Sequence, residues 1–322
     1  MKAVVYKIGK GIQFVDDRSQ PEPTDKQVAI RVCAAAINPV DYKLPAFIMN
    51  GRGVGLDVSG IVTKVGAKVT NFQVGDAVFG NTSGSLAEYA VCEPNKITHK
   101  PKSLSFAQAA AIPTAYLTGF QALHNHNFAA GSRLLVIGAS GGCGTAGVQL
   151  GKQMGAAEIV GICSKRNEEI VLAAGADRII DYNTQDPLRV CGDDYFDFVY
   201  DTATGSGAKE DYTSISRQLL KNPNPAQGIG MSITINGSIG AWLRSLLRME
   251  SSHTKLIQTK HSKQDLEAIL KLLHKNQNEL QFAPVIDRTI PFEKSYIVSG
   301  FQHLKSRRAR GKIVYEMTQP PD

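Results

Sequence analysis

The hydrophobic pattern of the first third of the chain is that of short strands. Up to about residue 115, apolar segments alternate with turns rich in glycine and asparagine, a pattern that favours a small, barrel-like β domain. The predicted strands cover residues 28–32, 58–65, 74–80 and 84–91. A helical pattern follows at residues 105–112, is broken at Pro113 and resumes at 114–123.

From about residue 116 to 260, strand-like and helix-like segments alternate. This spacing predicts a doubly wound parallel sheet of the α/β class. The predicted strands cover residues 134–137, 158–163, 178–182, 196–201, 231–235 and 256–259. An amphipathic helix at 263–273 and extended segments near 285–290 and 312–315 follow, and we expect this tail to return to the first domain. The predicted domains are therefore 1–115, completed by 261–322, and 116–260.

A strand that runs directly into glycines is the strongest local signal. Gly138, Gly141 and Gly144 permit a tight turn, close approach of the backbone to a pyrophosphate and close packing of helix on strand. The amino end of the following helix offers free N–H groups to phosphates. A second strand about 20 residues on favours a dinucleotide site over a glycine turn without ligand. The turn residues assigned to the cofactor are Gly138, Ser140, Gly141, Gly142, Cys143 and Gly144.

The residues after the second strand indicate which dinucleotide is bound. An NAD site usually places Asp or Glu there, whereas this chain has Ser164, Lys165 and Arg166. A hydroxyl and two cations suit a 2′-phosphate, which a carboxylate would repel. We therefore predict NADPH rather than NADH. The alternative is that Lys165 and Arg166 form a solvated helix start.

Composition narrows the function classes. The 322 residues are 43% hydrophobic and 20% charged, as in an ordinary globular protein. No apolar run approaches the roughly 20 residues of a membrane span, and residues 1–6 look like a first strand, so we expect a cytoplasmic protein. Anionic cofactors explain the net charge of +7 as well as nucleic acid does, and we do not expect a nucleic-acid partner. Five scattered cysteines without a Cys-x-x-Cys pair argue against a disulfide framework and a four-cysteine zinc site.

Five segments occur in the order typical of one family. They are residues 38–41 (Asn-Pro-Val-Asp), 75–80, 112–119, 138–144 and 308–314. With them the chain resembles the zinc-independent quinone oxidoreductase branch of the medium-chain dehydrogenase/reductase superfamily. The resemblance implies a GroES-like catalytic domain interrupted by a Rossmann domain, an active site in the cleft between them, and a homodimer.

Departures from the zinc-dependent members of that superfamily concern the metal ligands. Those enzymes place a Cys where this chain has Asn38, and a His-Glu pair where it has Leu56 and Asp57. We therefore expect no catalytic metal. Without a Lewis acid, hydride transfer to an acceptor that is already electrophilic is better supported than alcohol oxidation.

The resemblance also implies roles for individual residues. Asn38 and Thr118 are expected near the nicotinamide, and Tyr42 and Lys43 near the acceptor. Tyr182 is expected at the adenosine end. Backbone groups of the segments containing Asn236, Gly237, Leu256 and Gln258 are expected to line the nicotinamide. Three of these residues have a structural alternative. Asn38 before Pro39 can simply shape a turn, Thr118 can pack or cap a helix, and Tyr42 can be half-buried core.

Two functions follow from this pattern. The first is NADPH-dependent reduction of quinones or α,β-unsaturated carbonyls (enones or alkenals) by direct hydride transfer without metal. The alternative is a cofactor-binding regulatory protein of low activity that binds RNA or a membrane surface through the basic residues 305–312 and the segment around Trp242. That segment, residues 239–255, is equally compatible with a packed helix.

Overall fold

The computed structural model describes the chain except for residues 44–48, 205–211, 238–253, 277–278 and 318–322. The chain divides into two compact units. The first unit comprises Met1–Thr114, His261–Leu270 and Asn276–Asp322, and the second comprises Ala115–Lys260 and Lys271–Lys275. The segment around Trp242 lies outside the described residues.

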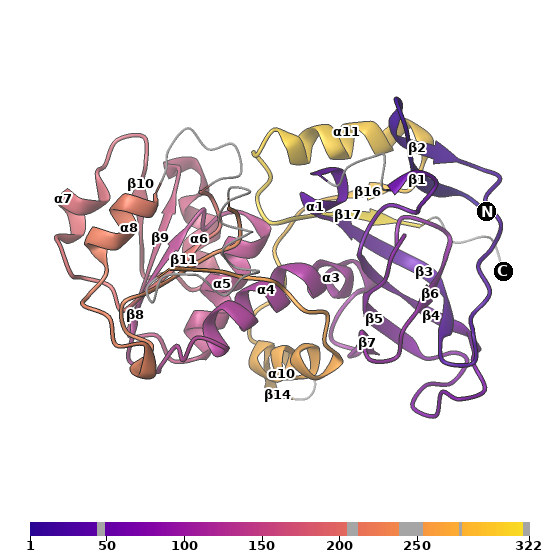
Figure 1. Ribbon diagram of the computed structural model, residues 1–322, viewed down its shortest axis with the longest axis horizontal. Helices are drawn as coiled ribbons and strands as arrows, with labels where there is room; N and C mark the ends of the chain where they lie inside the picture. The colour runs from indigo at the N-terminus through magenta and orange to yellow at the C-terminus, as the bar shows by residue number, and fades with distance from the viewer. Residues whose placement is uncertain (44–48, 205–211, 238–253, 277–278, 318–322) are drawn as a thin grey trace. The chain divides into compact units, whose positions relative to one another are not determined.

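The first unit is built on a mixed sheet of seven strands (Figure 1). The strand order is β16-β17-β3-β4-β5-β7, and β6 also pairs with β3. Only β16 and β17 are parallel neighbours; the other pairs are antiparallel. The strands are β3 (Val28–Ile37), β4 (Asp57–Val65), β5 (Ala77–Asn81), β6 (Tyr89–Cys92), β7 (Ile97–His99), β16 (Ile286–Pro291) and β17 (Lys312–Glu316). The tail strand β17 thus pairs directly with the long strand β3.

Alanines let a short helix approach this sheet closely. Helix α3 (Phe106–Ala111) packs Ala107, Ala110 and Ala111 against Ala34 and Ala36 of β3. A capping box starts the helix, because the Ser105 hydroxyl accepts from Gln108 N and the Gln108 side chain accepts from Ser105 N. The predicted helix at residues 105–112 is therefore present, and the run of alanines in β3 is explained by the helix lying on it.

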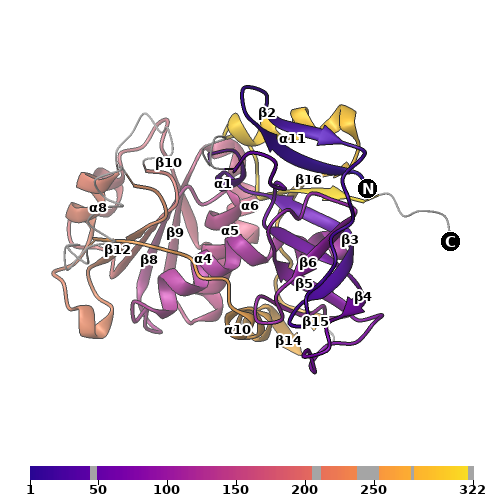
Figure 2. The ribbon, with the colours of Figure 1, turned by 45° about the vertical axis from the view of Figure 1, so that its right-hand side comes forward.

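Further elements complete the core on other parts of the first unit. Helix α11 (Lys294–Lys305) lies beside the hairpin of β1 (Ala3–Lys7) and β2 (Gly11–Val15), as Figures 1 and 2 show. It buries Ile297 and Phe301 in the largest apolar cluster of the unit. The remaining elements are α1 (Val40–Lys43), α10 (Lys263–Leu273), which contributes residues to both units, and the short strands β14 (His274–Asn276) and β15 (Glu279–Leu280).

The second unit contains a six-stranded parallel sheet. Its order is β10-β9-β8-β11-β12-β13, so the chain starts in the middle, moves to one edge and then crosses to the other side. This is the doubly wound arrangement expected from the sequence. The strands are β8 (Arg133–Ile137), β9 (Glu158–Cys163), β10 (Arg178–Asp181), β11 (Phe198–Asp201), β12 (Met231–Thr234) and β13 (Thr254–Leu256). The described helices of the unit are α4 (Pro113–His124), which begins in the first unit, α5 (Gly142–Gln153), α6 (Glu168–Ala173), α7 (Pro187–Cys191) and α8 (Thr213–Leu219), with single turns η1 (Lys165–Asn167) and η2 (Pro225–Gln227).

Several predicted strands have the wrong extent; β3 covers 28–37 rather than 28–32, and β5 covers 77–81 rather than 74–80. The segment 84–91 is a turn up to residue 88, because Gly84 adopts a φ of 83° and donates its N–H to Gly55 O. The last strand of the parallel sheet covers residues 254–256 rather than 256–259. Beyond this strand, the backbone N–H and carbonyl of Lys260 both form hydrogen bonds with the side chain of Gln121 in α4 rather than with a neighbouring strand.

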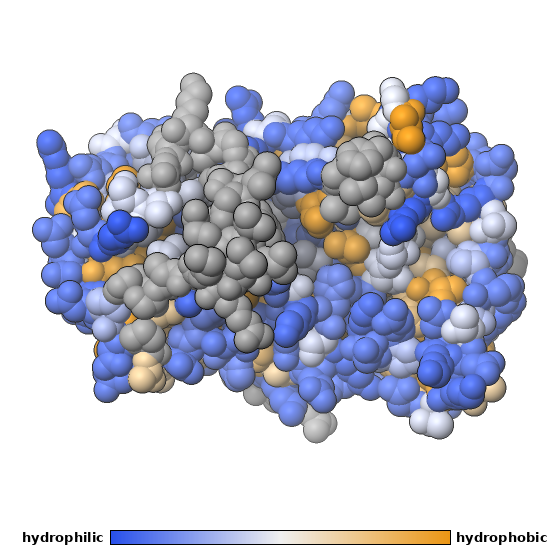
Figure 3. Space-filling view, in the orientation of Figure 1, coloured by the Kyte–Doolittle hydropathy of each residue, from blue (hydrophilic) through white to orange (hydrophobic). Residues whose placement is uncertain are grey.

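Polar residues predominate on the face of the molecule that Figure 3 shows. Within the described parts of the chain, every helix is too short or too polar to cross a lipid bilayer.

Glycines on α5 determine how closely this helix packs on the parallel sheet. A Cβ at Gly147 would lie 2.5 Å from Cδ1 of Tyr200, whose ring is fully buried on β11. A Cβ at Gly151 would lie 2.5 Å from a methyl group of Leu134 on β8. Gly147 and Gly151, which the sequence interpretation did not single out, therefore bring the helix down onto the strands.

We expect Gly147→Ala to destabilise the protein, although alanine is the better helix former. The gain in helix propensity is about 1 kcal/mol, and overpacking a rigid core typically costs roughly 1–3 kcal/mol. The free energy of unfolding in urea should therefore fall. The matched control is Gly141→Ser, because a Cβ there comes no closer than 3.5 Å to another residue and serine is a favourable N-cap. Equal stability of Gly147→Ala and the wild type would contradict this packing argument.

Candidate active site

The glycine turn lies where the parallel sheet changes its winding direction. Strand β8 has β9 on one side and β11 on the other, so the turn at its carboxyl end lies at the topological switch point where dinucleotides bind. Gly138 has a φ of 74°, and a Cβ there would lie 2.7 Å from Oγ1 of Thr202, the residue after β11. A Cβ at Gly144 would collide with the Gly138 carbonyl. The first and third glycines are therefore required by the turn itself.

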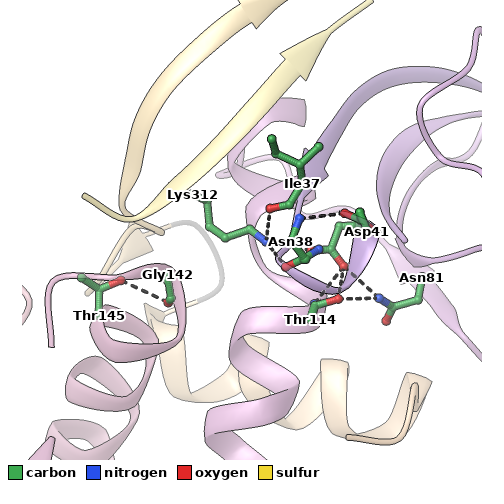
Figure 4. Close-up of polar contacts among 9 residues, drawn as sticks. Ile37, Asn38, Asp41, Asn81, Thr114, Gly142, Thr145 and Lys312 are labelled. Atoms are coloured by element: carbon green, nitrogen blue, oxygen red, sulfur yellow. Dashed lines mark hydrogen bonds and ion pairs between the residues drawn. The ribbon is translucent and has the colours of Figure 1, made fainter. Parts of the chain in front are cut away.

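Helix α5 begins at a glycine N-cap. Gly141 is its N-cap and provides no side chain to the first N–H groups of the helix. Thr145 donates its hydroxyl to the carbonyls of Gly141 and Gly142, at 3.0 and 3.2 Å, so this hydroxyl faces the helix backbone (Figure 4). Ser140 lies in the turn, and Gly142 and Cys143 are the first two residues of α5.

The end of β9 adds a residue that the sequence interpretation missed. Asn167 is 7% exposed, and its side-chain N–H group donates to the Ser140 hydroxyl at 2.9 Å. Asn167 Oδ1 and Ser164 Oγ are both buried without a hydrogen-bond partner in the described part of the chain. A buried polar atom without a partner is costly. The Ser164 hydroxyl is thus available to a hydroxyl or phosphate group of a bound molecule, and Asn167 Oδ1, an acceptor, to a hydroxyl group. A polar residue four positions after the end of β9 was the signal for Asn167.

The two cations predicted at this end are not equivalent. Lys165 Nζ lies 2.6 Å from Oε2 of Glu168. Arg166 has no carboxylate within ion-pair distance among the described residues. Tyr182 is 43% exposed, and its N–H donates to the Cys163 carbonyl, which brings it beside Ser164. The pKa of Asp181 is lowered, mainly by the N–H of Asn183 and also by the backbone N–H of Lys165. The carboxylate of Asp181 therefore lies near Lys165, which the sequence interpretation did not anticipate.

The residues expected around the nicotinamide in the second unit are spread over three segments. Thr118 is buried on α4, and its hydroxyl lies 2.8 Å from that of Thr259. Asn236 follows β12 and donates to the carbonyl of Thr202 at 3.4 Å. Leu256 is buried at the end of β13, whereas Gln258 is exposed. Gly237, the last described residue after β12, is half-buried.

A buried polar network surrounds Asn38 in the first unit (Figure 4). Lys312 at the start of β17 donates to Asn38 Oδ1 at 2.5 Å and to Asp57 Oδ2 at 3.0 Å. Asn38 Nδ2 also donates to Asp57 Oδ2, at 2.9 Å. Lys312, Asn38 and Asp57 are 5%, 5% and 0% exposed. The sequence interpretation named Asn38 but grouped Lys312 with the basic residues 305–312 as a surface cation. Its burial beside Asp57 could not be read along the chain, because the two residues are 255 positions apart.

Asp57 also connects this network to the amino end of α4. Its Oδ1 accepts from the N–H and the hydroxyl of Thr114, at 3.0 and 2.5 Å, and from Asn81 Nδ2 at 2.9 Å. A carboxylate at this position satisfies a free helix N–H and interacts favourably with the helix dipole.

Asp41 holds the backbone of the same residue. Its Oδ2 accepts the N–H of Asn38 at 2.7 Å, and the side chain is 1% exposed. Burial raises the pKa of Asp41 to about 7; the Asn38 N–H opposes this shift, the charge of Asp57 adds to it and that of Lys312 opposes it. Asp41 therefore orients its neighbour Asn38 and is not simply a solvated loop carboxylate.

Tyr42 and Lys43 lie close to cations of the tail. The Lys305 ammonium is 5.2 Å from the centre of the Tyr42 ring, which packs partly against the core. Burial raises the pKa of Tyr42, and the nearby Arg307 opposes the shift. Burial lowers the pKa of Lys43, and Arg307 lowers it further. Arg307 therefore lies beside Tyr42 and Lys43, the residues expected near the acceptor.

Metal ligands are not gathered anywhere in the described part of the chain. No group of three or more His, Cys, Asp or Glu side chains there is arranged to hold a metal ion.

The raised pKa of Asp41 predicts a specific pH dependence of stability. In the unfolded chain this carboxyl releases its proton near pH 4, whereas the folded protein retains it up to about pH 7. The free energy of unfolding of the wild type should therefore fall, relative to Asp41→Asn, by up to about 4 kcal/mol between pH 4 and 7. Urea unfolding at several pH values measures this difference, and a difference that rises with pH would show that Lys312 dominates instead.

Two family models match most of the chain. Residues 24–113 match the alcohol dehydrogenase GroES-like domain, and residues 174–314 match the zinc-binding dehydrogenase model. The chain is 32% identical over 311 residues to the 2-methylene-furan-3-one reductase of Solanum lycopersicum, covering 91% of this chain and 72% of that protein. It is 31% identical to the chloroplastic NADPH-dependent alkenal/one oxidoreductase of Arabidopsis thaliana, covering 98% and 79%.

Solved structures agree with this match. The quinone oxidoreductase of Coxiella burnetii has a TM-score of 0.80 at 27% identity, over 99% of both chains. The predicted α/β fold, with a GroES-like domain and a parallel-sheet Rossmann domain, is confirmed. The chain belongs to the quinone oxidoreductase branch of the medium-chain dehydrogenase/reductase superfamily and is an oxidoreductase.

Proposed function

We propose that the protein uses NADPH to reduce quinones or α,β-unsaturated carbonyls by direct hydride transfer without metal. One observation carries this proposal: the parallel sheet has a glycine turn and a helix amino end with a glycine N-cap at its switch point. The relatives support the cofactor and the acceptor class, since the Arabidopsis protein is named for NADPH and for alkenals and enones, and the Coxiella protein for quinones.

The described residues suit a dinucleotide. The backbone approaches the turn closely at Gly138 and Gly144, where side chains would collide with the protein itself. The N–H groups at the start of α5 suit the pyrophosphate, and Ser164 Oγ and Asn167 Oδ1 offer buried polar atoms to the ribose end. Bound NADPH supplies the hydride. We assign Thr118 and the Asn236, Gly237, Leu256 and Gln258 segments to its nicotinamide end.

Tyr42 and Lys43 are the donors that we assign to the acceptor. Hydride addition leaves negative charge on an oxygen of the quinone or enone, and a positioned donor stabilises that charge. Lys43 has a pKa lowered by burial and by Arg307, so it releases a proton more readily than an ordinary lysine. One proton then completes the reduction for each hydride added.

The absence of a catalytic metal is proposed from the ligand set. Asn38 and Leu56 cannot replace a thiolate and an imidazole, and the Asp57 carboxylate is already bound by Lys312 and four further hydrogen bonds. A homodimer and a cytoplasmic location remain predictions from the resemblance and the composition; the Arabidopsis relative is a chloroplast protein.

Turnover is the direct test of this function. NADPH oxidation should occur with quinones, enones or both, and Tyr42→Phe and Thr118→Ala should each lower kcat/KM by roughly ten-fold or more, as expected for lost transition-state donors and cofactor contacts. Lys64→Met, which changes an exposed lysine of the first unit, is the control. No turnover with any acceptor, together with steeply salt-dependent RNA binding, would favour the regulatory alternative.

Cofactor preference should depend on Arg166 more than on Lys165. Because Lys165 is paired with Glu168, Arg166 is the freer cation for a 2′-phosphate. Arg166→Glu should weaken NADPH binding at least ten-fold, a loss of about 1.4 kcal/mol, with little effect on NADH. Lys165→Glu should have the smaller effect. Equal affinities for both cofactors in the wild type and in Arg166→Glu would contradict the assignment.

A further inference from the structure

We propose that Lys312 and Asp57 are positioning residues that hold the Asn38 side-chain amide in one orientation. In that orientation the amide presents its second N–H as a donor to a carbonyl-type oxygen of a ligand. The proposal rests on the proposed function only for the identity of this ligand, which is either the carboxamide of the nicotinamide or the carbonyl of the acceptor.

Opposite charges lie at the two ends of the amide, and Figure 4 shows Lys312 at one of them. Asn38 Oδ1 lies 2.5 Å from the Lys312 ammonium, and Asn38 Nδ2 lies 2.9 Å from Oδ2 of Asp57. A flipped amide would place its N–H group against the ammonium and its oxygen against the carboxylate. Both contacts would be repulsive, so the ion pair selects one of the two orientations that an asparagine otherwise adopts.

The hydrogen bonds of both ions are already used. The three N–H bonds of Lys312 point to Asn38 Oδ1, Asp57 Oδ2 and the Ile37 carbonyl, the last at 3.3 Å. The Asp57 carboxylate accepts five hydrogen bonds. Neither group has spare capacity for a substrate, which makes them positioning residues rather than catalytic ones.

One donor of the network remains. An asparagine side chain carries two N–H bonds, and among the described residues Nδ2 has the single acceptor Asp57 Oδ2. The backbone of Asn38 is fixed as well, through its N–H to Asp41. The remaining N–H is thus a rigid donor on a buried side chain, and its complement is an oxygen acceptor.

Stability alone is a weak reason for such a pair. A buried ion pair is often replaced by apolar residues without loss of stability, and this one occupies a site where Lys312 is 5% and Asp57 0% exposed. Orientation of Asn38 gives the pair a function that an apolar pair would lack.

A double-mutant cycle on kcat/KM tests the proposal. We expect Asn38→Ala and Lys312→Met each to lower kcat/KM by about three- to ten-fold or more, the size of one hydrogen bond, and the double variant to be no worse than Asn38→Ala alone. Lys64→Met, the same substitution in an exposed lysine–glutamate pair on β4, should leave kcat/KM unchanged. If the losses of the two single variants instead multiply in the double variant, Lys312 does not act through Asn38 and the proposal is overturned.

The same variants identify the oxygen. If it belongs to the nicotinamide, the Kd for NADPH, measured by fluorescence titration, rises in Asn38→Ala and Lys312→Met. If it belongs to the acceptor, the Kd for NADPH is unchanged and kcat/KM for the acceptor falls alone.

A measurement that does not depend on enzyme activity tests the positioning role separately from the proposed function. The side-chain amide signal of Asn38 in a ¹H–¹⁵N spectrum is the one missing in Asn38→Ala. Its hydrogen exchange should be slow in the wild type and at least ten-fold faster in Asp57→Asn/Lys312→Met, a variant that avoids leaving one charge buried alone. Unchanged exchange would overturn the positioning role even if the protein reduced no quinone or enone, whereas inactivity of the wild type with faster exchange in the variant would overturn only the proposed function.

Discussion

The ion pair between Lys312 and Asp57 organises the polar interior of the first unit. It joins the start of β17, the start of β4 and the end of β3, and the same carboxylate binds the first turn of α4. All of these atoms are buried beside the large apolar cluster of the first unit. Such a pair persists only when its remaining hydrogen bonds are satisfied, and here every N–H of the ammonium and both carboxylate oxygens have partners.

The pair also bears on how this chain differs from its zinc-dependent relatives. In those enzymes the positions of Asn38, Leu56 and Asp57 hold a cysteine, a histidine and a glutamate, as the resemblance implies. In this chain the cation beside the carboxylate is the ammonium of Lys312. A fixed ammonium orients a neighbouring amide, but with its three N–H bonds in use it does not polarise an alcohol as a metal does. This agrees with an acceptor that is electrophilic before it binds.

The second unit depends on a different constraint, which is the close approach of glycine backbone to neighbouring groups. Gly138 and Gly144 shape the turn, and Gly147 and Gly151 let α5 settle on β8 and β11. The helix amino end therefore lies at the edge of the sheet with a glycine N-cap that provides no side chain. The phosphate-binding geometry is thus a consequence of how the helix packs.

Most of this architecture could be predicted from the sequence, because it depends on local periodicity. The helix at residues 263–273 was predicted with its observed bounds, since Leu266, Ile269 and Leu273 repeat at helical spacing and are buried. Contacts between distant segments could not be predicted in this way: Lys312 pairs with Asp57 across 255 positions. By contrast, the ion pair of Lys165 with Glu168 could have been predicted from the sequence, because residues three apart lie on the same side of a helical turn.

The most direct test of the central claim is the metal content of the active protein. Purified protein that oxidises NADPH with a quinone or enone acceptor is dialysed against a chelator, assayed again and analysed for zinc by mass spectrometry. The account predicts far less than one zinc per chain and an unchanged rate after chelation. One zinc per chain, with activity that is lost on chelation and restored by zinc, would contradict it.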